Sequence, residues 1–202
     1  MLGDIVIPKN NEAEFIELAS KLGFKKITFL YEFDDFSKEN KKNQMHIKNK
    51  DMRIGIGFIA NPKNISNALG HSKLIVAKSS DKDRIFIESR KIKLIYGFEE
   101  LQKKDYLHQR ASGLNHIECR LAKKNNVSIG FSYSSLLSKN NSLLIGRMIQ
   151  NISLCQKYKV KTIIGSFSSK PYEMRAPHDI ISLFTMFGMN GKIVRDSISY
   201  DL

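Results

Sequence analysis

Short apolar runs recur along the chain, and between them lie segments whose apolar residues recur at helical spacing. Apolar runs of about four to eight residues bounded by turn residues are typical of strands, and a three-to-four-residue period indicates a helix with one buried face. The pattern predicts strands over residues 3–8, 26–31, 53–60, 73–79, 92–98, 127–133 and 161–167. It predicts helices over 15–22, after Pro62, over 81–90, over 112–124, from Tyr133 to about Cys155, and over 177–187.

The alternation of strands with helices predicts a parallel sheet, because parallel neighbours need a crossover connection that a helix supplies. Most of the predicted strands are apolar throughout, which indicates a sheet covered on both faces. We therefore expect an α/β fold: a single TIM-like (β/α) barrel domain over residues 1–202, with seven clear strands and an irregular or loosely filled eighth position. A doubly wound open sheet is the alternative, but no GxGxxG follows the first strand.

Composition narrows the class of protein. A chain of 202 residues with 42% hydrophobic content can bury a sizeable core, and no apolar run approaches the length of a membrane span. The amino terminus lacks the basic-then-apolar layout of a secretory signal. Cys119 and Cys155 both fall in helical patterns, which predicts buried thiols in a reducing, cytoplasmic compartment.

The charge indicates a polyanionic partner. The chain has 33 basic and 20 acidic residues, which gives a net charge of +13 and a pI near 9.7. Such a surplus favours nucleic acid or an anionic membrane face. Compositional drift towards Lys, Asn and Ile explains scattered lysines, but explains less well the eight Arg residues, some of them beside Gly, Ser and Pro. The Lys-rich segment at 37–50 and Lys103-Lys104 would add attraction for phosphate that salt screens.

Residues 104–137 are the most informative stretch. Ser112-Gly113 offers a helix start, and Leu114, Ile117 and Leu121 recur as one core-facing stripe. If residue 110 leads into the first turn, Arg110 and Arg120 lie on one line of this helix, roughly 15 Å apart at 1.5 Å per residue. That span suits two phosphates. The alternative is that Arg120 only borders the core stripe and extends its charged end into water.

The same stretch resembles a known family. Leu107-His108-x-Arg110-x-Ser112-Gly113-Leu114-Asn115, Arg120-Leu121-Ala122 and Ile129-Gly130-Phe131-Ser132 are similar to archaeal ribonuclease P protein component 3, the TIM-barrel-like subunit related to a eukaryotic ribonuclease P and MRP subunit. Met174-Arg175-Ala176-Pro177-His178-Asp179 resembles the family's Leu-Arg-x-Pro-x-Asp segment. The resemblance covers residues 105–189, with Gln109 and Ala111 where the family pattern has Tyr and Asn.

This resemblance implies a protein subunit of ribonuclease P, which removes the 5′ leader from precursor tRNA. The RNA carries the chemistry through Mg²⁺, the isolated chain is not catalytic, and it binds no metal or other cofactor itself. The implied partners are the catalytic RNA, precursor tRNA, component 2 and the other protein components. We expect Arg110, Arg120 and Arg175 to face RNA, supported by His108, Asn115 and Lys123; Arg147 could serve RNA, a partner subunit or only solvent.

Two other functions remain open. A metal-dependent phosphoesterase on the same barrel superfamily needs converging His and carboxylates, whereas the five His here are dispersed without HxH or HExxH spacing. The second alternative function is a protein-interaction barrel whose charge reflects compositional drift.

At the carboxyl ends of the strands, where barrel enzymes place their sites, Asp105 could orient His108 or Arg110.

Overall fold

The protein is described by a computed structural model that covers residues 1–34, 51–137 and 141–200, in which seven parallel strands form one sheet in sequence order. The strands are β1 (Gly3–Val6), β2 (Lys26–Glu32), β3 (Arg53–Ile59), β4 (Ile75–Lys78), β5 (Leu94–Tyr96), β6 (Ser128–Ser132) and β7 (Thr162–Gly165). The basic insertion expected at 37–50 lies outside the described residues. All seven predicted strand positions are occupied by strands.

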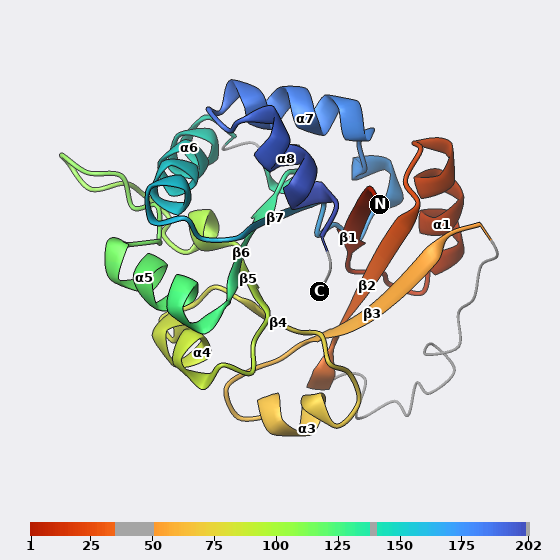
Figure 1. The fold of residues 1–202 in the computed structure, drawn as a ribbon, viewed down its shortest axis with the longest axis horizontal. Helices are drawn as coiled ribbons and strands as arrows, with labels where there is room; N and C mark the ends of the chain where they lie inside the picture. The colour runs from red at the N-terminus through yellow and green to blue at the C-terminus, as the bar shows by residue number, and fades with distance from the viewer. Residues whose placement is uncertain (35–50, 138–140, 201–202) are drawn as a thin grey trace.

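The sheet closes on itself between its first and last strands. The N–H of Ile7 donates to the carbonyl of Ser168 at 2.8 Å, and the N–H of Phe167 donates to the carbonyl of Ile5 at 2.7 Å. Figure 1 shows the strands surrounding a common centre with the helices outside them. The predicted TIM-like barrel with seven strands is confirmed, and the open doubly wound sheet is not formed.

Helices return the chain from the carboxyl end of one strand to the amino end of the next. They are α1 (Glu12–Lys21), α3 (Ile65–Leu69), α4 (Asp83–Ser89), α5 (His116–Asn125), α6 (Asn141–Tyr158), α7 (Pro177–Met186) and α8 (Gly191–Ile198). Short 3₁₀ turns follow β5, β6 and β7 as η2 (Phe98–Glu100), η3 (Ser134–Leu137) and η4 (Pro171–Glu173). No helix in the described part of the chain is both long and apolar enough to cross a membrane.

Three helix predictions need correction. The helix expected from Ser112 begins at His116. The long helix expected directly after Tyr133 begins at Asn141, behind the separate turn η3. Helix α8 was not predicted, because its apolar positions are few and follow closely on α7.

The barrel interior is filled by side chains rather than solvent. Ile5, Val76 and Ile163 are fully buried in one inner cluster, and the rings of Tyr96 and Phe167 stack with their centroids 4.4 Å apart. Gly57 makes room for this packing, since a Cβ there would lie 2.7 Å from Leu74 Cγ. The barrel is therefore a packed core and not a pore.

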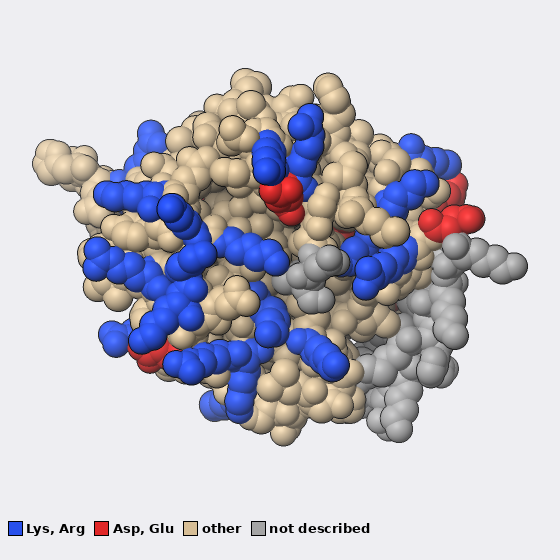
Figure 2. Space-filling view, viewed as in Figure 1, with Lys and Arg blue, Asp and Glu red and all other residues tan. Residues whose placement is uncertain are grey.

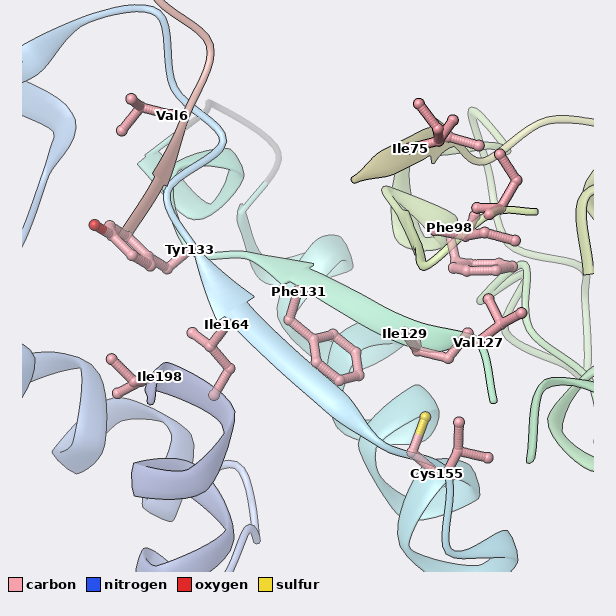
Figure 3. Close-up of a cluster of buried hydrophobic side chains, with 14 of the residues drawn as sticks. Val6, Ile75, Phe98, Val127, Ile129, Phe131, Tyr133, Cys155, Ile164 and Ile198 are labelled. Carbon is pink, nitrogen blue, oxygen red and sulfur yellow. The ribbon is translucent and has the colours of Figure 1, made fainter. Parts of the chain in front are cut away.

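A second apolar layer joins the strands to the helices. Figure 3 shows Phe131 and Ile164 of adjacent strands pointing toward the surrounding helices, with Cys155 of α6 and Ile198 of α8 nearby. Burying a side chain such as Phe131 stabilises the fold by about 1.5–3 kcal/mol. Cys119 and Cys155 are buried free thiols, as predicted.

The carboxy-terminal residues close the amino end of the barrel. The hydroxyl of Tyr200 donates to the carbonyl of Asp4 at 2.8 Å, and Lys26 Nζ donates to the carbonyl of Tyr200 at 2.9 Å. The Lys26 ammonium also lies 4.4 Å from the centre of the Tyr200 ring. Because Lys26 begins β2, this is the amino end of the sheet, and it is the end that faces the viewer in Figure 1, with α8 crossing in front of β7.

Candidate nucleic-acid interface

The residues predicted to face RNA fall at two ends of the barrel. The loop of residues 101–115 follows β5 and η2 at the carboxyl end and carries His108 and Arg110, and it is the loop that projects furthest outward in Figure 1. Arg175 follows β7 at the same end. Helix α5 runs back toward the amino end, so Arg120 and Lys123 approach the opposite side of the barrel. All five side chains are exposed.

The start of α5 is built by a capping box. The side-chain oxygen of Asn115 accepts the N–H groups of Ile117 and Glu118, each at 2.9 Å, and the Glu118 carboxylate accepts the N–H of Asn115 at 3.1 Å. Asn115 therefore caps the start of this helix. Ser112 is buried and does not cap the helix.

Because α5 begins after residue 115, the expected line of Arg110 and Arg120 along this helix is wrong. Gly113 has a φ of +84°, and a Cβ on it would lie 2.3 Å from the carbonyl oxygen of Phe98. Glycine at this position therefore allows a close approach of two backbone segments. The expected core stripe also changes: Ile117 is 53% exposed, and Cys119 and Ala122 are the residues that α5 buries.

Arg110 is anchored to α6 while its side chain stays exposed. Its Nη1 donates to the carbonyl of Gly146 at 2.7 Å. A Cβ at Gly146 would lie 2.6 Å from that same nitrogen, so a larger residue there would displace the guanidinium from this position. The anchor uses one of the five N–H donors of the guanidinium, and the remaining donors can meet a phosphate.

Arg147 is buried, with 1% of its surface exposed, so the expectation that it contacts RNA does not fit the structure. Its Nε donates to Asp105 Oδ1 at 2.7 Å, and its Nη1 donates to the carbonyls of Glu99 at 2.9 Å and Gln102 at 2.6 Å. Asp105 also accepts the N–H of Ala111 at 2.9 Å. Asp105 thus orients Arg147 and the loop backbone rather than His108 or Arg110.

Asn151 completes this attachment of the loop to α6. Its Nδ2 donates to the carbonyl of Ser112 at 2.8 Å and to Glu99 Oε1 at 3.0 Å. Burial raises the pKa of the Glu99 carboxyl to about 7. The N–H of Ala111, together with Arg147, holds the pKa of Asp105 below its ordinary value. Sequence reasoning missed this network, whose only signal was two polar residues on the apolar side of α6.

On the other side of α5, Arg120 lies over an aromatic ring. Its guanidinium carbon is 5.5 Å from the centre of the Tyr158 ring of α6. Lys123 is exposed in the last turn of the same helix, where a cation also favours the helix dipole. Such a cation–π contact orients Arg120 and leaves its fork of donors at the surface.

Arg175 is held by the backbone around it. Its Nη1 donates to the carbonyls of Tyr172 at 2.9 Å and Met174 at 2.8 Å. Beside it an apolar cleft of about 380 Å³ is lined by Tyr133, which follows β6, and by residues of η3, α6 and α7, including Ile180. The guanidinium therefore sits at the edge of a partly apolar surface.

The hydroxyls at the carboxyl ends of β6 and β7 face inward. Tyr133 donates to Asp4 Oδ2 at 2.7 Å, the Ser166 N–H donates to Asp4 Oδ1 at 2.7 Å, and Ser132 donates to the Ser166 carbonyl at 2.8 Å. Burial raises the pKa of Asp4 to about 6. Within residues 1–34, 51–137 and 141–200, no three His, Cys, Asp or Glu side chains are grouped so as to hold a metal ion.

Fold and surface together define a cationic TIM-like barrel protein. Residues 103–201, just under half of the chain, match the family model described as RNase P subunit p30. The resemblance found in the sequence is thereby confirmed, and the matched residues include the loop, α5 and the strands β6 and β7.

Curated relatives carry a related description, "Ribonuclease P protein component 3". The relative from Methanococcoides burtonii is 34% identical over 87 residues, which cover 40% of this chain and 34% of the relative. That from Methanococcus vannielii is 30% identical over 62% of this chain and 58% of its own length. That from Methanothermobacter thermautotrophicus is 21% identical over 90% of this chain and 77% of its own. The matches to the first two relatives span about a third and somewhat over half of their lengths.

Solved structures agree on the fold. A chain in a structure titled "cryo-EM structure of archaeal Ribonuclease P with mature tRNA" aligns with a TM-score of 0.71 at 15% identity, covering 98% of this chain and 88% of that one. A crystal structure of an amidohydrolase aligns with a TM-score of 0.57 at 8% identity, covering 98% of this chain and 72% of that one. At these identities the likeness extends to the barrel alone.

Proposed function

We propose that this chain is a protein subunit of ribonuclease P, which binds and stabilises the catalytic RNA during removal of the 5′ leader from precursor tRNA. The observation that carries the proposal is the family match over residues 103–201. The relatives described as ribonuclease P protein component 3 support it.

In this function the chain supplies cations and shape, and the RNA supplies the chemistry. Exposed guanidiniums at Arg110, Arg120 and Arg175 are each held by neighbouring groups, so little side-chain freedom is lost when a phosphate binds. His108 and Lys123 add a ring and an ammonium at the surface. Mg²⁺ belongs to the RNA in this proposal, and the isolated chain does not cleave.

The proposal includes protein partners as well as RNA. Component 2 and the other protein components join the chain and the RNA in a cytoplasmic complex. The apolar cleft beside Arg175 and the exposed Leu107, which is 91% accessible, offer surfaces that a protein partner can cover.

Reconstitution tests the proposal. The RNA subunit and the other protein components are assembled with and without this chain, and cleavage of a precursor tRNA is measured at physiological Mg²⁺. We expect the rate to depend on the chain, and the chain alone to leave the substrate intact. Cleavage by the isolated chain, abolished by a chelator, would instead support a phosphoesterase; unchanged cleavage in its absence would contradict the proposal.

A further inference from the structure

The cations of this barrel are concentrated at its amino end, opposite the end where barrel enzymes place their sites. The segments that lead into the strands carry exposed basic residues almost all the way round. They are Lys25 before β2, Arg53 at the start of β3, Lys73 before β4, Lys91 and Lys93 before β5, and Lys159 and Lys161 before β7. We call this set the amino-end ring.

Backbone pairing places these residues at one level of the barrel. The N–H of Arg53 donates to the carbonyl of Lys25, the N–H of Lys93 to that of Ile75, and the N–H of Ile129 to that of Lys161. Each of these bonds joins residues at or just before the starts of two neighbouring strands, at the amino end of the sheet. Figure 2, which views this end, shows Lys and Arg side chains spread across the face and few Asp or Glu side chains.

Acidic residues are sparse here and frequent at the opposite end. At the amino end, within the described residues, the loops that lead into the strands and helix α8 contain two acidic residues, Asp51 and Asp196. The carboxyl end holds many more, in the segments after the strands: Glu12, Glu32, Asp34, Asp81, Asp83, Glu99, Glu100, Asp105 and Glu173. The positive field of the protein is therefore directed out of the amino end.

Four lysines of the ring take no part in the ion pairs of the described residues. Lys25, Lys73, Lys93 and Lys159 are exposed, and none of the ion pairs among residues 1–34, 51–137 and 141–200 involves them. Lysines in the last turn of a helix also stabilise the helix dipole. These four lie beyond the last helical turn, so the dipole does not account for them.

A cleft lies next to the ring. It has a volume of about 460 Å³ and opens between α5, α6 and α8, with Lys123, Lys159 and Lys161 among its lining residues and Asp196 as its acid. Apolar side chains, including Ile152, Val160 and Met189, form much of its wall. An apolar cleft bordered by ammonium groups suits an unstacked nucleobase whose neighbouring phosphates meet the lysines.

We propose that the amino-end ring and this cleft bind the phosphate backbone of a folded RNA, as a surface separate from the Arg110 and Arg175 side of the barrel. Lysine is a compact, strongly hydrated point charge that attracts phosphate without reading base edges, so the ring binds sequence-independently. Placed at opposite ends, the two surfaces allow one barrel to join two segments of one RNA. The inference rests on the proposed function only for the identity of that RNA.

The test uses two variants of the full chain with equal loss of charge. In the ring variant Lys25, Lys73, Lys93 and Lys159 are changed to Gln; in the control variant Lys9, Lys63, Lys78 and Lys82, exposed at the carboxyl end, are changed to Gln. Binding to a ribonuclease P RNA transcript is measured over a series of salt concentrations. We expect at least about tenfold weaker binding at 0.1 M salt for the ring variant, and a salt slope smaller by about three.

A third variant with Arg at the four ring positions should bind about as well as the parent chain, because the charges are kept. Equal losses in the ring and control variants would overturn the inference, since net charge alone would then explain binding. So would a ring variant that loses binding only to phosphatidylserine vesicles. Reconstituted cleavage could proceed equally well without this protein while the ring variant still binds RNA more weakly. That result would contradict the proposed function and leave the inference about the amino-end ring intact.

Discussion

Arg147 Nε lies 2.7 Å from Asp105 Oδ1, although 42 residues separate the two in sequence. The pair fastens the loop of residues 101–115 to α6, because the same Asp105 oxygen also accepts the N–H of Ala111 next to Arg110. The position of Arg110 at the surface therefore depends on a guanidinium that never reaches solvent. The buried Arg147 fixes the loop, and the exposed Arg110 is the residue that the loop places at the surface.

Replacing Arg147 by Met should lower the free energy of unfolding by about 3 kcal/mol, because Asp105 and the carbonyls of Glu99 and Gln102 would lose their donor. Urea unfolding followed by circular dichroism measures the change. The matched control is Arg84→Met, which breaks an exposed pair with Glu88 and should cost less than about 1 kcal/mol. Equal losses in the two variants would contradict the structural role.

Changing Arg110 and Arg175 together to Gln should weaken RNA-dependent cleavage in the reconstituted enzyme and leave the thermal midpoint nearly unchanged. Both side chains are exposed, and their intramolecular bonds go to backbone carbonyls rather than to charged groups. Each lost phosphate contact should reduce the salt slope of binding by about 0.7 to 0.9. A large fall in the midpoint with an unaltered slope would make these residues structural.

The Glu99 carboxyl makes a pH-dependent contribution to stability. Burial raises its pKa from 4.5 to about 7, so below pH 7 the folded protein holds a proton that the unfolded chain releases above about pH 4.5. The free energy of unfolding should therefore fall as pH rises between those values, by about 3 kcal/mol from this group, and then level off. Asp4, with a pKa raised to about 6, acts in the same direction.

Glu99→Gln should reduce the change of unfolding free energy with pH between pH 5 and 7. Glutamine keeps a side-chain oxygen that can accept from Asn151 Nδ2, and it cannot ionise. Urea unfolding at a series of pH values measures it, with Glu88→Gln on the exposed face of α4 as the control. If the parent and the Glu99→Gln protein show the same slope, Glu99 does not titrate as its burial implies.

The strands were predictable from the sequence and the loop attachment was not. Most strands are short, largely apolar runs of a length that helices rarely have, so pattern alone located all seven. Ser112-Gly113 resembled a helix start, yet the Asn115 and Glu118 capping box lay three residues further on and decided the boundary. The tendency of Ser112 to start a helix is weaker than the reciprocal hydrogen bonds of Asn115 and Glu118.

Arg147 shows why the site was harder to predict than the fold. Its neighbours Gly146 and Met148 give no sign of its burial, and its partner Asp105 belongs to a distant loop. Long-range polar pairs leave no periodic signal, whereas apolar faces do. The amino-end ring, in contrast, follows from where the strands begin, because Lys73 and Lys93 directly precede apolar runs.

Gly113→Ala should destabilise the protein more than the same change at Gly23. Both glycines have positive φ, +84° at Gly113 and +87° at Gly23, so an alanine is strained at either position by about 1 kcal/mol. At Gly113 the new Cβ would also lie 2.3 Å from the Phe98 carbonyl oxygen, whereas at Gly23 nothing lies within 4 Å. The loss at Gly113 should reach about 3 kcal/mol, because backbone must move to relieve the clash.

Thermal and urea unfolding of the two alanine variants measure this difference directly. RNA binding adds a second readout, since a displaced Gly113 would shift the loop that carries Arg110 and leave the amino-end ring in place. Binding should therefore weaken in the Gly113 variant at temperatures where it remains folded, and stay unchanged in the Gly23 variant. Equal stability losses would mean that positive φ alone, and not the approach to Phe98, requires glycine at position 113.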